Sequence, residues 1–144
     1  MENRLDISAL KKAAEAFDNA LAFARKVEEK PKDAQEFYEM ESARAAVIQH
    51  FEFTYELCWK MMKRYIEIDS GSEEADVLTR KDLFRLSAEK KLIAGFDKWV
   101  EFHKARNRTS HIYNETAAVE VYETAKIFAG PLHEFITAIE QRIL

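Results

Sequence analysis

The stretch "IQHFEFTYELCWKMMKRY", residues 48–65, decides the fold. Its apolar side chains recur at alternating intervals of four and three, which places them on one face of an α-helix: Phe51, Tyr55, Cys58, Met62 and Tyr65. Glu56 and Lys60 occupy another face, four residues apart, where oppositely charged side chains pair. We therefore expect one long helix from about Asp33 to Asp69.

The chain on either side of this helix shows the same periodicity. A first helix is expected before Pro31, because the residue that precedes a proline disfavours helical geometry. Its apolar stripe contains Leu10, Ala14, Phe17, Leu21 and Ala24. After the long helix, "DSGSEEAD", residues 69–76, breaks the pattern and is expected to be a short acidic loop.

The sequence predicts three more helices after this loop. Thr79 starts the third, with Asp82 at the capping-box position, and this helix stops before Gly95. The fourth carries four side chains at helical spacing, namely Phe96, Trp99, His103 and Arg106. Asn114 or Thr116 would cap the last helix. Its stripe passes Gly130–Pro131 without a phase break, so we expect one helix kinked at Pro131.

The composition indicates an all-α fold. The 144 residues include only three glycines and two prolines, which leaves little room for hairpins. We expect an up-and-down bundle of four to five helices, forming a single domain over residues 1–144. The apolar stripes are wide for a lone monomer, so we expect a homodimer. The lone cysteine, Cys58, and the lack of a long apolar run indicate a cytoplasmic protein without a membrane segment.

Several classes of chemistry are excluded by missing motifs. Glycines stand only at positions 71, 95 and 130, so no phosphate-binding loop is present. None of the four histidines has a glutamate three residues before it, and the single cysteine disfavours a structural zinc site. We therefore expect no metal and no cofactor. A net charge of −4 does not suggest nucleic-acid binding unless a local basic patch provides it.

Such a patch lies in "ARNRTSHIYNETA", residues 105–117, and the residue before it. From Lys104 to Ile112 the chain has four basic residues and no carboxylate: Lys104, Arg106, Arg108 and His111. Arg106 and His111 would point about 140° apart on a continuous helix, so they converge only if the helix ends between them. The Thr109 and Ser110 hydroxyls favour such an end, since they compete for backbone partners.

These residue types are those that metal-free phosphodiester chemistry needs. A histidine can move the proton and an arginine can stabilise charge on the phosphoryl group. Simpler explanations remain open, because basic residues at a helix C-terminus also oppose the helix dipole favourably. Tyr113 could be a packing residue and Asn107 a helix cap. Trp59 is expected in the core, and His50 and His103 receive no role.

The long helix carries other candidates near this patch. Glu52, Glu56 and Lys60 lie on one face and could shape a groove beside the basic segment. The alternative, which we favour, is a solvated network of charges four residues apart, worth a few tenths of a kcal/mol per pair.

The arrangement Arg106–Asn107–x3–His111–x–Tyr113 resembles the R-N-x3-H-x-Y motif of the HEPN superfamily. More narrowly, it is similar to the nucleotidyltransferase substrate-binding proteins, small helical bundles encoded beside a minimal nucleotidyltransferase. Residues 48–65 and 105–118 match that family beyond the minimal motif. Two positions depart from its pattern: Ala105 stands where many relatives have an acidic residue, and Ile112 replaces a commoner threonine.

The resemblance implies a two-component, toxin–antitoxin-like system. Some family members are metal-independent ribonuclease toxins, with Arg106 and His111 matching a catalytic pair that both subunits of a dimer supply. The partner nucleotidyltransferase attaches AMP to the tyrosine that matches Tyr113, or, in an older description, receives its substrate from the helical protein. We expect Arg106, Asn107, Arg108 and Tyr113 to bind nucleotide or RNA. A non-catalytic interaction module is the remaining alternative.

Overall fold

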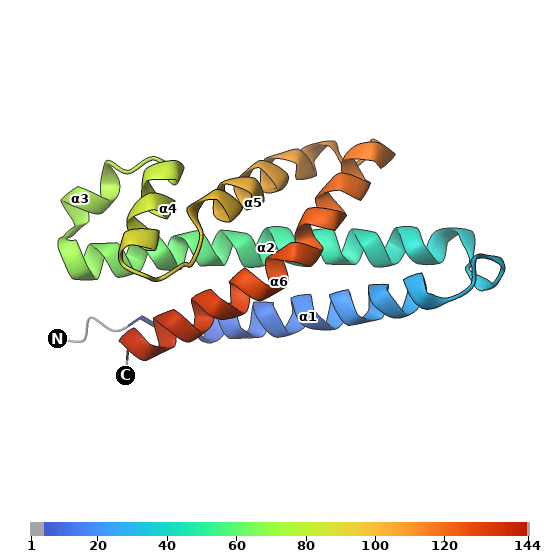
Figure 1. Cartoon of the computed structure of the whole chain (residues 1–144), viewed down its shortest axis with the longest axis horizontal. Coiled ribbons are helices and arrows are strands. Elements are labelled where there is room, and N and C mark those ends of the chain that lie inside the picture. Colours follow the sequence, from blue (N-terminus) through green and yellow to red (C-terminus); the bar gives the residue numbers. More distant parts are fainter. Residues whose placement is uncertain (1–4, 144) are drawn as a thin grey trace.

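Two long antiparallel helices, α1 (Ser8–Glu29) and α2 (Phe37–Ser70), form the base of the computed structural model, which describes residues 5–143 (Figure 1). α6 (Glu115–Arg142) crosses diagonally and packs on both, while α5 (Phe96–Arg108) runs beside α2 and also contacts α6. The expected all-α bundle is confirmed. The ends of the expected domain, residues 1–4 and Leu144, lie outside the described residues.

The smaller elements lie at the end of α2 (Figure 1). They are α3 (Ser72–Asp76) and α4 (Arg80–Glu89). The acidic stretch expected to be a loop therefore contains a helix, and residues 5–143 contain six α-helices instead of four to five. Buried Ala75 anchors α3, and Glu73 and Glu74 in its first turn interact favourably with the helix dipole.

The connection between α1 and α2 differs from the expectation in one respect. α1 stops before Pro31 as predicted, with Lys30 in an extended conformation. α2, however, begins at Phe37 and not at Asp33, which lies in a separate 3₁₀ turn. The Gln35 side-chain amide donates to the carbonyl oxygens of Val27 (3.2 Å) and Lys30 (2.9 Å). These bonds satisfy the end of α1 and keep the next residues extended.

The predicted starts of α4 and α6 are confirmed in detail. The Thr79 hydroxyl accepts a hydrogen bond from the Asp82 backbone N–H (3.1 Å), and the Asp82 carboxylate accepts one from the Thr79 backbone N–H (3.3 Å). This capping box begins α4. Asn114, and not Thr116, caps α6 by accepting from the Ala117 N–H (3.2 Å). α6 runs through Pro131 as one helix.

An aromatic core holds α5 against α2 and α6. The Phe128 ring on α6 packs edge-on against four other rings at centroid distances of 5.0–5.7 Å: Phe17, Phe51, Trp99 and Phe102. The α2 stripe is fully buried from Phe51 to Met62, whereas Tyr65 is only partly buried and Ile66 takes the core position. Because Trp99 fixes the rotation of α5, Arg106, two turns later, faces α2.

No helix within residues 5–143 is long and apolar enough to cross a membrane.

Candidate functional site

The basic segment is divided by the end of α5. The helix stops at Arg108 and a 3₁₀ turn, Thr109–His111, follows, as the two hydroxyl residues predicted. The Thr109 hydroxyl lies 2.7 Å from the Arg106 carbonyl oxygen, and the Ser110 hydroxyl donates to the Asn107 carbonyl (3.2 Å). Both hydroxyls thus lie within hydrogen-bond distance of backbone carbonyls at the helix end.

Arg106 is half-buried and faces α2. Its Nε donates to the Glu56 carboxylate at 3.2 Å, and one terminal nitrogen lies 4.0 Å from the Glu52 carboxylate. The same nitrogen lies 3.5 Å from the Thr109 hydroxyl, which in turn contacts Glu52. Two carboxylates and a hydroxyl therefore hold the guanidinium in one orientation.

The favoured interpretation of Glu52 and Glu56 as a solvated network was wrong. Both carboxylates reach the basic segment, and Glu56 forms no ion pair with Lys60 within residues 5–143. The Lys60 ammonium lies 5.8 Å from the Trp59 ring centroid instead. The physical reason is that α5 presents a guanidinium to α2, and charge-assisted bonds to it are stronger than a solvated lysine pair.

His111 and Tyr113 lie on the other side of the helix end, in the connection that leads to α6. Both are exposed, Tyr113 with 85% of its surface accessible. Their rings pack edge to face with centroids 6.1 Å apart. Among the described residues, the polar contacts of Arg106 go to α2 and Thr109 and none goes to His111. Within one chain, His111 therefore contacts Tyr113, Arg106 contacts Glu52 and Glu56, and no polar contact joins Arg106 to His111 within residues 5–143.

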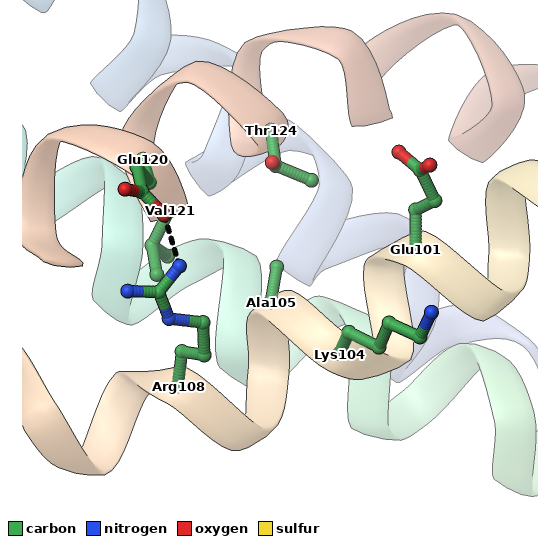
Figure 2. Close-up of a pocket in the computed structure, with 7 residues that line it drawn as sticks. All are labelled: Glu101, Lys104, Ala105, Arg108, Glu120, Val121 and Thr124. Carbon is green, nitrogen blue, oxygen red and sulfur yellow. Dashed lines mark hydrogen bonds and ion pairs between the residues drawn. The ribbon is translucent and has the colours of Figure 1, made fainter.

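Arg108 points away from Arg106. Figure 2 shows its guanidinium against Glu120 of α6, with which it forms an ion pair, while the Glu101 carboxylate points away from the Lys104 ammonium. These side chains line a pocket of about 170 Å³ between α5 and α6. The carboxylates that pair with Arg106 and Arg108 therefore come from other helices, α2 and α6, and the two arginines do not form one continuous patch.

A second polar cluster, which the sequence did not indicate, surrounds His103. Its Nδ1 lies 2.9 Å from the Tyr55 hydroxyl, its Nε2 lies 3.4 Å from the Asn107 amide, and Arg80 lies 3.5 Å from Nδ1. The Arg80 guanidinium stacks 3.6 Å from the Trp59 ring centroid. Trp59, expected in the core, is half-buried: it packs against the core and also carries the Arg80 cation on its ring.

Burial sets the protonation of this second cluster. It lowers the pKa of His103, and the neighbouring Arg80 cation lowers that pKa further. Burial also raises the pKa of Tyr55, so the phenol is neutral at pH 7. The one available signal in the sequence was the spacing of His103 and Asn107, which are four residues apart on one face of α5.

Comparison with known proteins gives a consistent result. The family model described as "Nucleotidyltransferase substrate binding protein like" matches residues 5–141. A Haemophilus influenzae protein named "Probable ribonuclease HepT" is 40% identical over 79 residues, which is 54% of this chain and about half the length of that relative.

A solved Haemophilus influenzae structure superposes on the chain with a TM-score of 0.81 and 26% identity. The superposition covers 94% of this chain and 99% of the other. Its description says that it reveals the fold of a substrate-binding domain of a nucleotidyltransferase.

Proposed function

The chain belongs to the family of proteins like the nucleotidyltransferase substrate-binding protein, and from this membership we propose that it is the helical subunit of a two-component nucleotidyltransferase system. It binds a separate nucleotidyltransferase and offers the end of α5 to nucleotide or RNA. The transferase supplies the nucleotidyl transfer, since this sequence contains no Asp-x-Asp pair to bind the metal, although it has one Gly-Ser pair at Gly71–Ser72.

The exposure of Tyr113 is the observation that carries this proposal. A transferase active site must reach the phenol oxygen, and 85% of the Tyr113 surface is accessible. In the proposed reaction this oxygen attacks the α-phosphorus of ATP, the bond to pyrophosphate breaks, and a base takes the phenol proton. Tyr55 and Tyr122 are buried and cannot serve as acceptors.

The test is a transfer assay with the partner transferase, ATP and magnesium, followed by intact-mass measurement. We expect the protein to gain one AMP moiety and Tyr113→Phe to gain none. Tyr38→Phe is the matched control, because Tyr38 is also exposed (70%) but lies at the start of α2. Unchanged modification of Tyr113→Phe would place the acceptor elsewhere.

A second candidate function is metal-independent RNA cleavage by a homodimer. It is supported by the separation of Arg106 from His111 within one chain, since an exposed His111 is free to approach Arg106 of a second copy. In such a composite site, His111 would move the proton and Arg106 would stabilise the charge on the phosphorus. The name of the Haemophilus influenzae relative also favours a ribonuclease.

Mixing two inactive variants tests the composite site. His111→Ala and Arg106→Ala should each abolish cleavage measured in EDTA while helicity is retained. After random exchange of subunits, half of the dimers would carry one intact site, so about a quarter of the activity should return. A mixture that stays inactive, although its subunits exchange, would exclude a site shared between copies.

Arg106→Lys distinguishes both functions from simple docking. Lysine keeps the charge, but it cannot form the planar two-pronged contact with phosphate. If the protein is only an interaction module, Arg106→Lys should still bind the transferase in a pull-down and behave like the unmodified protein. If Arg106 recognises a phosphate, the same variant should lose AMP transfer or RNA cleavage.

A further inference from the structure

Arg80, at the start of α4, is a half-buried cation without an anionic partner within residues 5–143. Its guanidinium lies flat on Trp59, 3.6 Å from the ring centroid, and one terminal nitrogen donates to the Tyr55 hydroxyl at 3.2 Å. Arginine side chains that are removed from water are normally paired with carboxylates. This one is held by stacking and a neutral oxygen, so its remaining N–H groups are available to a ligand.

The hydrogen bonds of the cluster fix the direction of its donors. Arginine can only donate, so the Tyr55 oxygen accepts from Arg80. Tyr55 is fully buried, and among the described residues the one further partner of its hydroxyl is Nδ1 of His103, at 2.9 Å. The Tyr55 O–H therefore donates to Nδ1, and the neutral imidazole carries its proton on Nε2.

This tautomer makes Nε2 a second N–H donor, so Nε2 does not accept from the Asn107 amide nitrogen 3.4 Å away. Nε2 of His103 lies on the side of Asn107, whose side chain is exposed. Together with Arg80 and the Asn107 amide group, the cluster thus presents N–H donors. Donors of this kind recognise a phosphate oxygen.

The cluster lies next to the Arg106 site. Arg106 stands three residues after His103 on α5, so the two side chains share one face of this helix, and Asn107 follows Arg106 in the chain. The two guanidinium groups differ in one respect: Arg106 is paired with Glu56, while Arg80 is unpaired within residues 5–143. A strand whose phosphate contacts Arg106 would therefore find a second cationic site close by.

We propose that Arg80, His103 and Asn107 form a second phosphate subsite, which binds a phosphate of the RNA strand next to the one at Arg106. The proposal rests on RNA binding at Arg106 as part of the proposed function. Stacking on Trp59 keeps the Arg80 fork in place before RNA binds, so little side-chain entropy is lost on binding.

The experiment uses the full chain and a fluorescein-labelled 2′-O-methyl uridine dodecamer, which cannot be cleaved through its 2′-oxygen. Fluorescence anisotropy gives the Kd at several salt concentrations. We expect Arg80→Gln to weaken binding about tenfold and to reduce the slope of log K against log salt by about 0.7, the contribution of one phosphate contact on a single strand. Arg85→Gln is the control, because Arg85 is exposed on the same helix and paired with Asp82.

Arg106→Gln is measured in parallel so that the two proposals can fail separately. Normal binding by Arg80→Gln, with weakened binding by Arg106→Gln, would overturn the subsite and leave the Arg106 site standing. The reverse result would place a phosphate contact at Arg80 but none at Arg106, and would overturn both the Arg106 site and the proposal that the two sites bind neighbouring phosphates. Undiminished binding by both variants, or no binding by the unmodified protein, would overturn both. If circular dichroism shows that Arg80→Gln is unfolded, Arg80→Lys and Asn107→Asp replace it and should both weaken binding.

Discussion

Replacing Glu56 with glutamine should lower the stability of the protein and raise its affinity for RNA. Glu56 accepts a hydrogen bond from Nε of Arg106 at 3.2 Å, and it is the main charged partner of that guanidinium. The amide oxygen of Gln can still accept this bond, but the negative charge that competes with a phosphate is removed. The two expected effects therefore have opposite signs.

The magnitude follows from the exposure of the pair. The Arg106 and Glu56 side chains are 31% and 30% exposed, so the ion pair lies between a surface pair and a buried one. Its loss should cost about 0.5–1 kcal/mol of unfolding free energy, with the neutral hydrogen bond retained. Removing one repelling charge near a bound phosphate should contribute about 1 kcal/mol to binding, or roughly fivefold in Kd.

Urea denaturation measures the first effect, and anisotropy with the 2′-O-methyl uridine dodecamer measures the second. Glu41→Gln is the matched control, because it removes the same charge from an exposed position on α2 about 22 Å away along the helix. It should change neither quantity by more than about 0.5 kcal/mol. Weaker RNA binding by Glu56→Gln would refute the reasoning, since Glu56 would then orient Arg106 for RNA instead of competing with it.

Three further predictions concern the scaffold. Thr79→Ala removes the hydroxyl that accepts from the Asp82 backbone N–H and should lower the free energy of unfolding, measured by urea denaturation, by about 1 kcal/mol. Thr116→Ala is the control, because Thr116 does not cap α6, and it should cost less than about 0.5 kcal/mol. Equal losses would contradict the cap assignment. Phe128→Ala should lower the free energy of unfolding by about 3–5 kcal/mol in the same assay, because four aromatic rings surround this fully buried side chain. A loss under about 2 kcal/mol would mean that the neighbouring side chains move in to fill the cavity. In the folded protein the pKa of His103 lies below its ordinary value of 6.5, so the unfolded chain binds the proton at a higher pH than the folded chain does. The contribution of neutral His103 to the free energy of unfolding is therefore complete above pH 6.5. It decreases as the pH falls from 6.5 to the folded-state pKa. The urea midpoint should therefore drop more between pH 7 and pH 5 for the unmodified protein than for His103→Gln, and parallel profiles would exclude this linkage.

The helices could be predicted from the sequence because their signals are local. The stripe of α2, the capping box at Thr79 and the end of α5 at Arg108 all depend on residues within four positions of one another. The predicted start of α2 was wrong because it depends on a contact that is not local. It depends on Gln35, whose amide bonds to Val27, eight residues earlier and in another helix. No periodicity contains that information.

The charge environment of the candidate site could not be predicted in the same way. The sequence shows no carboxylate between Lys104 and Ile112, yet the fold brings Glu52 and Glu56 to this segment from about 50 residues away. Tyr55 and Arg80 meet His103 from 48 and 23 residues away. Such contacts depend on the rotation of α5 against α2, which the aromatic core determines only once the chain is folded.

The resulting site is close to electrically neutral, and this bears on how it would hold RNA. Arg80 and Arg106 carry two positive charges, Glu52 and Glu56 carry two negative ones, and burial keeps His103 uncharged near pH 7. Affinity for a phosphate then comes from donors already in place more than from net charge. Arg80→Lys, which keeps the charge but not the planar fork, should therefore weaken RNA binding almost as much as Arg80→Gln, and binding like that of the unmodified protein would refute this argument.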